Sequence, residues 1–216
     1  MGNIQDSLWF RSFSDLSVEK NFKRGEIYTR QGEALNAVAL IIAGKATAIS
    51  YSVNGDETWV GEYAEGQFIG LRALLTNEDL MIEIRTTRNL RVLSISQDQM
   101  LKLMREAPSL CEAVAVDLAE RLNKSVADLV DVHTLSVKGR ICAELLDRAS
   151  PIGIDPDRQI IRPSPVFVEL ARRLNSTRET VSRTVSELQN KGILIRQPGA
   201  LVIESPERLR DAVEYI

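Results

Sequence analysis

The 216-residue chain contains one histidine, two cysteines and no long apolar run. No segment reaches the roughly 20 consecutive apolar residues that a membrane-spanning helix needs. The first residues, MGNIQDSLWF, also lack the basic and then apolar pattern of a secretory signal. The sequence therefore predicts a cytoplasmic protein that makes no membrane contact.

The scarcity of metal ligands excludes several kinds of site. A metal-dependent β-roll enzyme needs several histidines and a carboxylate around one ion, but His133 is the only histidine. Iron–sulphur centres need a cysteine cluster, and Cys111 and Cys142 have no partner at metal-ligand spacing. Glycine-rich phosphate loops, nucleophile elbows and paired-carboxylate motifs are missing too. We expect no catalytic activity, no haem, iron–sulphur or metal cofactor, and buried packing roles for both cysteines.

The net charge is −3, and the charged residues are distributed unevenly along the chain. Residues 1–135 hold 14 Lys+Arg and 19 Asp+Glu, whereas residues 136–216 hold 13 and 11. The small positive excess lies in the last third of the chain, which favours contact with nucleic acid there.

Short β-prone runs separated by turn residues fill the region from Phe22 to Ile95. Turn residues recur about every ten positions, and Asn54-Gly55 between two such runs is a strong hairpin signal. Residues 1–107 are therefore predicted to form an antiparallel β-roll or sandwich.

Residues 108–135 are predicted to form a helix, because the spacing of their apolar residues differs from that of the β-prone region. From residue 111 to residue 132, small or apolar side chains recur with 4-3-4-3 spacing, the pattern of a heptad seam. We interpret the seam as a parallel dimer interface, although a helix packed only on its own β-domain is an alternative. The predicted interface residues are Cys111, Ala115, Leu118, Leu122, Ser125, Leu129 and Val132.

Residues 136–216 alternate short helices with short strands. Ser136 is the expected N-cap of a helix over 137–149, and residues 150–165 form a connector or small hairpin. Two strands should flank the Pro198-Gly199 turn, and Ser205 should cap the last helix.

Two further helices, joined by a tight turn, lie between these segments. Each has one apolar stripe: the first is Phe167, Leu170, Ala171 and Leu174, and the second is Val181, Val185 and Leu188. This layout is typical of a helix-turn-helix, whose second helix presents the residues at its N-terminal end to the major groove. The predicted DNA-binding residues are Ser176, Thr177, Arg178, Glu179, Ser182 and Arg183.

The chemistry of these side chains suits DNA. Arg can donate twice to guanine, Glu can accept from the cytosine amino group, and Ser or Thr at a helix start can bind phosphate. Two alternatives involve no ligand: Ser176 and Glu179 match a capping box, and Glu179 and Arg183 match a helical ion pair.

The stretch STRETVSR followed by VSELQNKGIL resembles the recognition helix of the Crp/Fnr family of bacterial transcription regulators, named for the cyclic-AMP receptor protein. GEIYTRQGE, LIIAGKATA, NGDE and EGQFIG resemble the family's β-roll, and LAERLN and VKGRICAELL resemble its dimer helix and hinge. The resemblance implies an α+β fold with an N-terminal antiparallel β-roll of the cyclic-nucleotide-binding kind, a long dimerisation helix and a C-terminal winged helix-turn-helix. It also implies a homodimer that binds double-stranded DNA and has RNA polymerase as a partner.

The resemblance further implies how the DNA is read. Arg178 and Arg183 would read guanines and Glu179 a cytosine in TGTGA-like half-sites of an inverted repeat, with residues 136–216 as the DNA-binding domain. The rival hypothesis is a β-roll sensor or adaptor whose winged helix binds protein, but that function does not need two outward arginines.

The segment after the F-x-G turn departs from the family pattern. In the cyclic-AMP branch a Glu there holds the ribose, and an Arg-Ser or Arg-Thr pair about ten residues later holds the phosphate. Leu71 occupies the first position here and Leu80-Met81 the second, so a bound phosphate would lose its counter-charge. Arg72 or Arg85 could substitute if the alignment is shifted.

We therefore predict an effector pocket that does not bind cyclic AMP. Ser125 contributes to it because it matches a family threonine that contacts the adenine. An apolar small molecule, a different nucleotide and no effector at all remain open. The predicted pocket residues are Gly70, Leu71, Arg72, Leu80, Met81 and Ser125.

Overall fold

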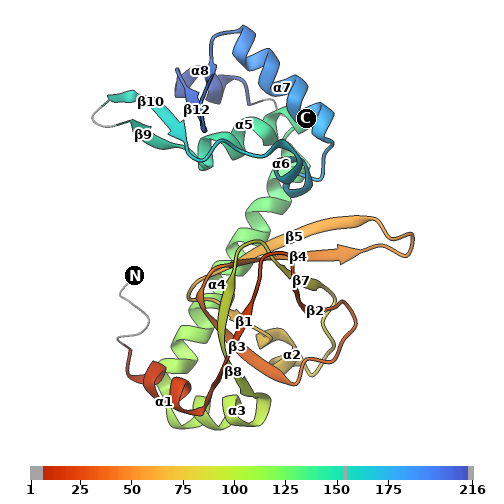
Figure 1. The fold of residues 1–216 in the computed structure, drawn as a ribbon, viewed down its shortest axis with the longest axis vertical. Coiled ribbons are helices and arrows are strands. Elements are labelled where there is room, and N and C mark those ends of the chain that lie inside the picture. The colour runs from red at the N-terminus through yellow and green to blue at the C-terminus, as the bar shows by residue number, and fades with distance from the viewer. Residues whose placement is uncertain (1–6, 153–154, 214–216) are drawn as a thin grey trace. The chain divides into compact units, whose positions relative to one another are not determined.

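The long helix α4 (Pro108–Thr134) is shared by two compact units. The computed structural model describes residues 7–152 and 155–213. Unit 1 ends at Asn123, inside α4, and unit 2 begins at Lys124. The two units are described separately below, and Figure 1 labels their helices and strands.

Unit 1 combines short strands with helices that begin and end it and one short helix between β6 and β7. Its strands are β1 (Val18–Phe22), β2 (Ile27–Thr29), β3 (Ala37–Ala43), β4 (Lys45–Tyr51), β5 (Glu57–Ala64), β6 (Phe68–Ile69), β7 (Glu83–Thr86) and β8 (Leu90–Ser96). Its helices are α1 (Leu8–Leu16), α2 (Leu71–Thr76), α3 (Gln97–Glu106) and the first part of α4.

The strands form two antiparallel sheets, ordered β1-β8-β3-β6 and β2-β7-β4-β5, which together make the β-roll. The hairpin expected at Asn54-Gly55 is confirmed: β4 pairs with β5, and the Ser52 amide donates to the Asp56 carbonyl oxygen at 3.0 Å. Gly55 has a φ of +86°, a conformation that glycine adopts without strain.

The core of unit 1 lies on both faces of the β8 sheet because side chains alternate along a strand. Leu90 and Val92 of β8 pack in a cluster that joins the two sheets. Leu93 and Ile95 point the other way, into a cluster that α1, α3 and α4 complete. The predicted β-roll is therefore confirmed, and one face of it supports the start of α4.

Unit 2 contains the second part of α4 and a set of short elements. The helices are α5 (Val137–Asp147), α6 (Phe167–Arg173), α7 (Arg178–Asn190) and α8 (Pro206–Asp211). The strands are β9 (Ser150–Ile152), β10 (Asp155–Ile161), β11 (Leu194–Gln197) and β12 (Ala200–Ile203), ordered β11-β12-β10-β9 in one antiparallel sheet. The hairpin at Pro198-Gly199 is confirmed, and the connector of residues 150–165 forms a second hairpin on the same sheet.

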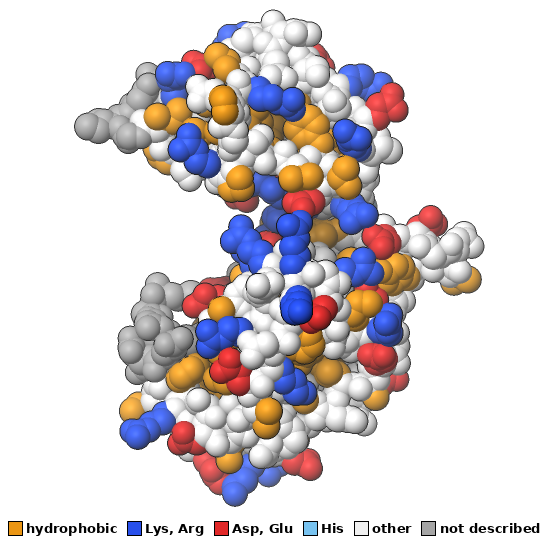
Figure 2. Space-filling model, in the orientation of Figure 1, with side chains coloured by type: hydrophobic (Ala, Val, Ile, Leu, Met, Phe, Trp, Pro, Cys, Tyr) orange, Lys and Arg blue, Asp and Glu red, His pale blue; other side chains and the backbone are white. Residues whose placement is uncertain are grey.

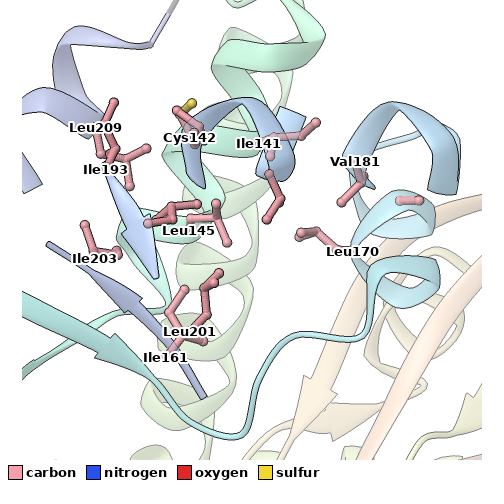
Figure 3. Packing of buried hydrophobic residues seen from close by; sticks show 14 residues of the cluster. Ile141, Cys142, Leu145, Ile161, Leu170, Val181, Ile193, Leu201, Ile203 and Leu209 are labelled. Carbon is pink, nitrogen blue, oxygen red and sulfur yellow. The ribbon is translucent and has the colours of Figure 1, made fainter. Parts of the chain in front are cut away.

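A single apolar cluster holds unit 2 together. Figure 3 shows Ile141 and Leu145 of α5 among side chains from α6, α7 and the sheet, including Leu170, Val181 and Ile203. The predicted N-caps are also confirmed: Ser136 accepts from the Gly139 amide, and Ser205 accepts from the Arg208 amide.

The two cysteines differ in burial, which corrects one expectation. Cys142 is fully buried in the unit 2 cluster, as expected. Cys111 is only half-buried, and its thiol donates to the Met104 carbonyl oxygen at 3.0 Å. Cys111 is less buried because Leu110 and Val114 are the residues of this part of α4 that fill the unit 1 core, which leaves Cys111 at the edge of the packed face.

Candidate nucleic-acid interface

Helix α7 is amphipathic, and its buried face anchors it in unit 2. Val181, Val185 and Leu188 are fully buried, and Thr184 is 5% exposed. The helix begins after Thr177, whose hydroxyl accepts from the Thr180 amide at 3.2 Å. The apolar stripe predicted from the sequence therefore orients the opposite face of α7 outward.

The outward face gathers the predicted reading residues in one place. Arg178, Glu179, Ser182, Arg183 and Ser186 line one open hollow on the surface, with a volume of about 530 Å³. The two arginines and Glu179 are exposed, and Ser182 is half-buried. Ser186 joins the predicted residues at this hollow and is exposed.

Neither ligand-free explanation of these residues matches the structure. The N-cap is Thr177 rather than Ser176, and its side chain interacts with Thr180, so the alternative of a Ser176–Glu179 capping box does not hold. Glu179 and Arg183 form no ion pair with each other, and in the described part of the chain neither they nor Arg178 have a side-chain partner. Their donors and acceptor are available for a ligand.

A tight turn sets the angle between α6 and α7. Asn175 adopts a φ of +47°, and the Ser176 amide donates to the Ala171 carbonyl oxygen at 2.8 Å. Leu170 and Ala171 of α6 are buried beside Val181 in the unit 2 cluster. The arrangement is a helix-turn-helix with α7 as its outer helix.

The β11–β12 hairpin is held next to α6. The Ser164 amide donates to the carbonyl oxygen of Gly199 at the hairpin turn, at 2.9 Å. Arg196 of β11 lies over the Phe167 ring, 5.2 Å from its centroid, in a cation–π contact. These contacts make the hairpin a wing on the helix-turn-helix.

Ion pairs support the helices from behind. Glu187 of α7 accepts from Lys138 of α5 at 3.0 Å and from Lys191 at 2.7 Å. Hydrogen bonds from Lys191 and Lys138 lower the pKa of the Glu187 carboxyl below its usual value. Glu144 of α5 also pairs with Arg173 of α6 at 2.8 Å, so α5 is tied to both neighbouring helices.

We use the name effector turn for residues 70–81, the segment that follows β6 and contains α2. Gly70 has a φ of +95°, and a Cβ atom there would lie 2.6 Å from the Ala37 carbonyl oxygen, so only glycine fits. Leu71 and Leu80 are buried, and Leu71 packs in the unit 1 core, whereas Met81 is 69% exposed. Ser125, the remaining predicted pocket residue, is exposed and belongs to unit 2.

Arg72 and Arg85, the two candidate substitutes for the family's phosphate-binding arginine, are engaged within unit 1. Arg72 pairs with Glu78 at 2.5 Å and donates to the Asp79 carbonyl oxygen at 2.6 Å. Arg85 donates to Glu83 at 2.6 Å and to the Tyr51 hydroxyl at 2.8 Å. The positions where the cyclic-AMP branch has its Glu and Arg therefore carry apolar side chains, and neither nearby arginine is without a partner.

Sequence reasoning missed Arg121, which α4 places against β6. Its guanidinium donates to the Phe68 carbonyl oxygen, pairs with Asp117 at 3.0 Å and lies 4.3 Å from the centroid of Tyr63. Burial raises the pKa of the Asp117 carboxyl, against the effect of Arg121. The i, i+4 spacing of Asp117 and Arg121 in a stretch of small and apolar residues was the available signal.

The predicted dimer seam is mostly exposed along α4. Leu122, Leu129 and Val132 are 64%, 57% and 46% exposed, and Ala115 and Ser125 are exposed as well. Cys111 and Leu118 differ because they are half-buried against their own unit. Within the described residues, no other segment buries this row of apolar side chains on α4.

The fold and the site together define a class: a sensor β-roll joined through a long helix to a winged helix-turn-helix. Comparisons agree with this class. The family model "Cyclic nucleotide-binding domain" matches residues 19–107, and the model "Crp-like helix-turn-helix domain" matches residues 139–212. The chain belongs to the Crp/Fnr family of DNA-binding transcription regulators.

Individual relatives are distant. A CRP-like cAMP-activated global transcriptional regulator of Mycobacterium tuberculosis is 22% identical over 88% of this chain and 85% of its own. The CRP-like protein Clp of Xanthomonas euvesicatoria is 27% identical over 76% and 74%. The solved structure of the c-di-GMP responsive global regulator CLP of Xanthomonas campestris has a TM-score of 0.78 at 23% identity, covering 90% of this chain and 97% of that one.

Within residues 7–152 and 155–213, no helix is long and apolar enough to cross a membrane. In the same residues, no group of three or more histidine, cysteine or acidic side chains could hold a metal ion.

Proposed function

We propose that this chain acts in the cytoplasm as a homodimer that binds an inverted repeat with TGTGA-like half-sites. In each half-site Arg178 and Arg183 read guanines and Glu179 reads a cytosine, while Ser176, Thr177 and Ser182 contact phosphates or base edges. One observation carries the proposal: Arg178, Glu179 and Arg183 lie on the exposed face of α7, and their side chains have no partner among the described residues. RNA polymerase is the proposed protein partner.

The proposed dimer interface is the exposed row of α4. Two copies packed in parallel along Ala115, Leu122, Ser125, Leu129 and Val132 would remove this apolar row from water. Cys111 and Leu118 lie at the edge of the interface because they also pack within unit 1. In this scheme residues 1–107 sense, residues 108–135 dimerise and residues 136–216 bind DNA.

The proposed effector domain does not bind cyclic AMP. Leu71 and Leu80 are buried apolar residues, and Arg72 and Arg85 already have acidic partners. The M. tuberculosis relative is named as cAMP-activated and the X. campestris structure as c-di-GMP responsive. An apolar molecule, another nucleotide such as c-di-GMP, or no effector are the remaining choices.

The test is a titration of purified protein into a labelled duplex carrying TGTGA-N6-TCACA and into a scrambled duplex. Salt is held constant because binding to phosphates varies steeply with ionic strength. Each titration is repeated with cyclic AMP and with c-di-GMP. The expected result is specific binding that cyclic AMP does not change.

The other outcomes separate the parts of the proposal. Binding that appears only with cyclic AMP contradicts the interpretation of Leu71 and Leu80. Equal binding to both duplexes under all conditions contradicts the proposed operator. A winged helix that binds protein in place of DNA, the second candidate function, predicts no binding to either duplex and no effect of changing Arg183.

A further inference from the structure

The face of α4 that packs on the β-roll changes in character along the helix. Its first part is apolar, because Leu110 and Val114 are buried in the unit 1 core. The next two residues on this face are charged: Asp117 is 6% exposed, and Arg121 is half-buried. Figure 2 shows the ordinary place of acidic and basic side chains, scattered over the outer surface. A charged pair between a helix and the sheets beneath it departs from that pattern.

Arg121 joins α4 to both sheets of the β-roll. Its Nε and Nη2 atoms each donate to Asp117 Oδ1 at 3.2 Å, and Nη2 also donates to the Phe68 carbonyl oxygen of β6. The guanidinium lies 4.3 Å from the centroid of the Tyr63 ring on β5, which belongs to the other sheet. Hydrogen bonds are directional and apolar packing is not. The pair therefore defines one angular position of α4 on the roll.

An aliphatic row of α4 competes with the charged pair for the same place. The row is spaced by four residues and consists of Leu110, Val114, Leu118 and Leu122. Because a helix has 3.6 residues per turn, each member lies about 40° further around the helix than the one before it. A modest rotation of α4 would therefore turn Leu118 and Leu122 onto the roll in place of the charged pair.

The structure keeps the charged pair on the roll and the end of the aliphatic row in water. Leu118 is half-buried, and Leu122 is 64% exposed. Stability alone does not favour this choice, since a buried ion pair often contributes less than well-packed apolar side chains of similar volume. Rotation would, however, remove Arg121 from the Phe68 carbonyl oxygen, and a buried acceptor that loses its donor is costly.

We propose that the Asp117–Arg121 pair sets the rotation of α4 on the β-roll and thereby keeps Leu122 outward for a second copy of this chain. The inference rests on the proposed function, because that copy packs along the exposed row of α4. Buried polar groups can specify one packing of a helix among several that apolar packing alone would allow. The pair is thus a positioning device for the dimer, and it makes no contact with the partner in this scheme.

The test replaces the pair with apolar side chains of similar size. The pair variant is Asp117→Leu with Arg121→Met, and the matched control is Glu83→Leu with Arg85→Met. Glu83 is a second buried carboxylate of unit 1, and Arg85 donates to it at 2.6 Å. The other side-chain contacts of this control pair are with β4, β5 and Arg30, and within the described residues none is with α4. Each double variant removes one acidic and one basic group.

Sedimentation measures dimerisation, and Trp fluorescence during denaturation measures stability on dilute protein, where dimerisation contributes little. We expect the pair variant to unfold at a denaturant concentration no lower than the control variant does. It should dimerise roughly tenfold more weakly than wild type, because one leucine per protomer is withdrawn from the interface. The control variant should dimerise as wild type does, and so should Asp117→Asn, which still accepts from Arg121.

Two results overturn the proposal. One is equal dimerisation by the two double variants. The other is a pair variant that does not fold, or that unfolds at a lower denaturant concentration than the control variant, because the pair would then supply stability and not position.

A thiol probe measures the rotation without a dimer. Leu122→Cys is introduced into wild type and into the pair variant, and modification of residue 122 in dilute protein is followed by mass spectrometry. We expect residue 122 to react several-fold more slowly in the pair variant, because it turns toward the roll. Equal rates in the two backgrounds overturn the proposal.

A failure of the proposed function would look different. Wild-type protein would then remain a monomer at every concentration, and sedimentation would not distinguish the variants. The two modification rates decide the inference in that case, since they report the position of Leu122 on its own β-roll.

Discussion

The start of α7 and the effector turn both place arginines beside acidic residues, but only one leaves them available. In α7, Arg178 and Arg183 project from an exposed face, and Glu179 between them makes no ion pair with either. In the effector turn, Arg72 is held by Glu78 and by the Asp79 carbonyl oxygen. The difference teaches that an arginine recognises an external anion only when its donors are not already used within the chain.

The largest expected effect concerns the shape of the effector turn. Gly70→Ala should lower the free energy of unfolding of unit 1 by roughly 2–4 kcal/mol, because the new Cβ combines a left-handed φ with a clash against the Ala37 carbonyl oxygen. Chemical denaturation followed by Trp fluorescence measures it. Gly55→Ala, with a φ of +86° and nothing within 4 Å, is the control and should cost about 1 kcal/mol. Equal losses would mean that the turn relaxes and that its backbone does not define the site.

The second prediction tests the exposed arginines at the start of α7. Arg183→Ala should weaken operator binding by about 1–3 kcal/mol and relax specificity at one base pair, because a free bidentate donor to a guanine is lost. Titration of duplexes with each base substituted in turn measures both quantities. Arg210→Ala, an exposed arginine of α8, serves as the control. Uniform weakening on every sequence would assign Arg183 to phosphate contact and remove its reading role.

A smaller effect is expected at Arg72. Arg72→Gln breaks an exposed ion pair and should change stability by about 0–1 kcal/mol. DNA affinity should be unaltered, because this guanidinium is satisfied within its own turn. Calorimetric titration with cyclic AMP and c-di-GMP completes the test. If either nucleotide binds wild type and fails to bind Arg72→Gln, then Arg72 leaves Glu78 to hold a ligand and the contrast with α7 disappears.

The sequence predicted the elements of the fold more fully than the state of the charged side chains. The β-roll, the long helix and the winged helix-turn-helix follow from local patterns: Asn54-Gly55, the period of α4, and the apolar stripe of Val181, Val185 and Leu188. These patterns reflect which face of an element is buried, which is a property of neighbouring residues.

Ion-pair partners depend on contacts between distant segments. Glu179 and Arg183 have the spacing of an ion pair and do not form one, whereas Lys138 and Glu187 are 49 positions apart and do. Arg121 shows both cases: its ion pair with Asp117 is local, whereas its hydrogen bond to the Phe68 carbonyl oxygen joins α4 to β6, far away in the sequence. Spacing alone therefore predicted the outward face of α7 but left open whether its charged side chains pair with each other.

The smallest predicted effect concerns Glu187, near the C-terminal end of α7. Lys138 and Lys191 donate hydrogen bonds to the Glu187 carboxylate, and these bonds lower the pKa of Glu187. A lowered pKa in the folded state stabilises the protein above the unfolded value and loses that contribution as pH falls through the folded value. Glu187→Gln should therefore lower the melting temperature slightly at pH 7, and the difference from wild type should vanish in acid.

Glu179→Gln is the matched variant, because Glu179 lies on the same helix and has no side-chain partner among the described residues. At pH 7 it should lower the melting temperature less than Glu187→Gln does while weakening operator binding, since a neutral amide accepts less strongly from a cytosine amino group. Thermal scans from pH 7 to about pH 3 and one titration at pH 7 measure both variants. A larger loss of melting temperature at pH 7 in Glu179→Gln than in Glu187→Gln, or unchanged operator binding by Glu179→Gln, would contradict the division of α7 into a reading half and a structural half.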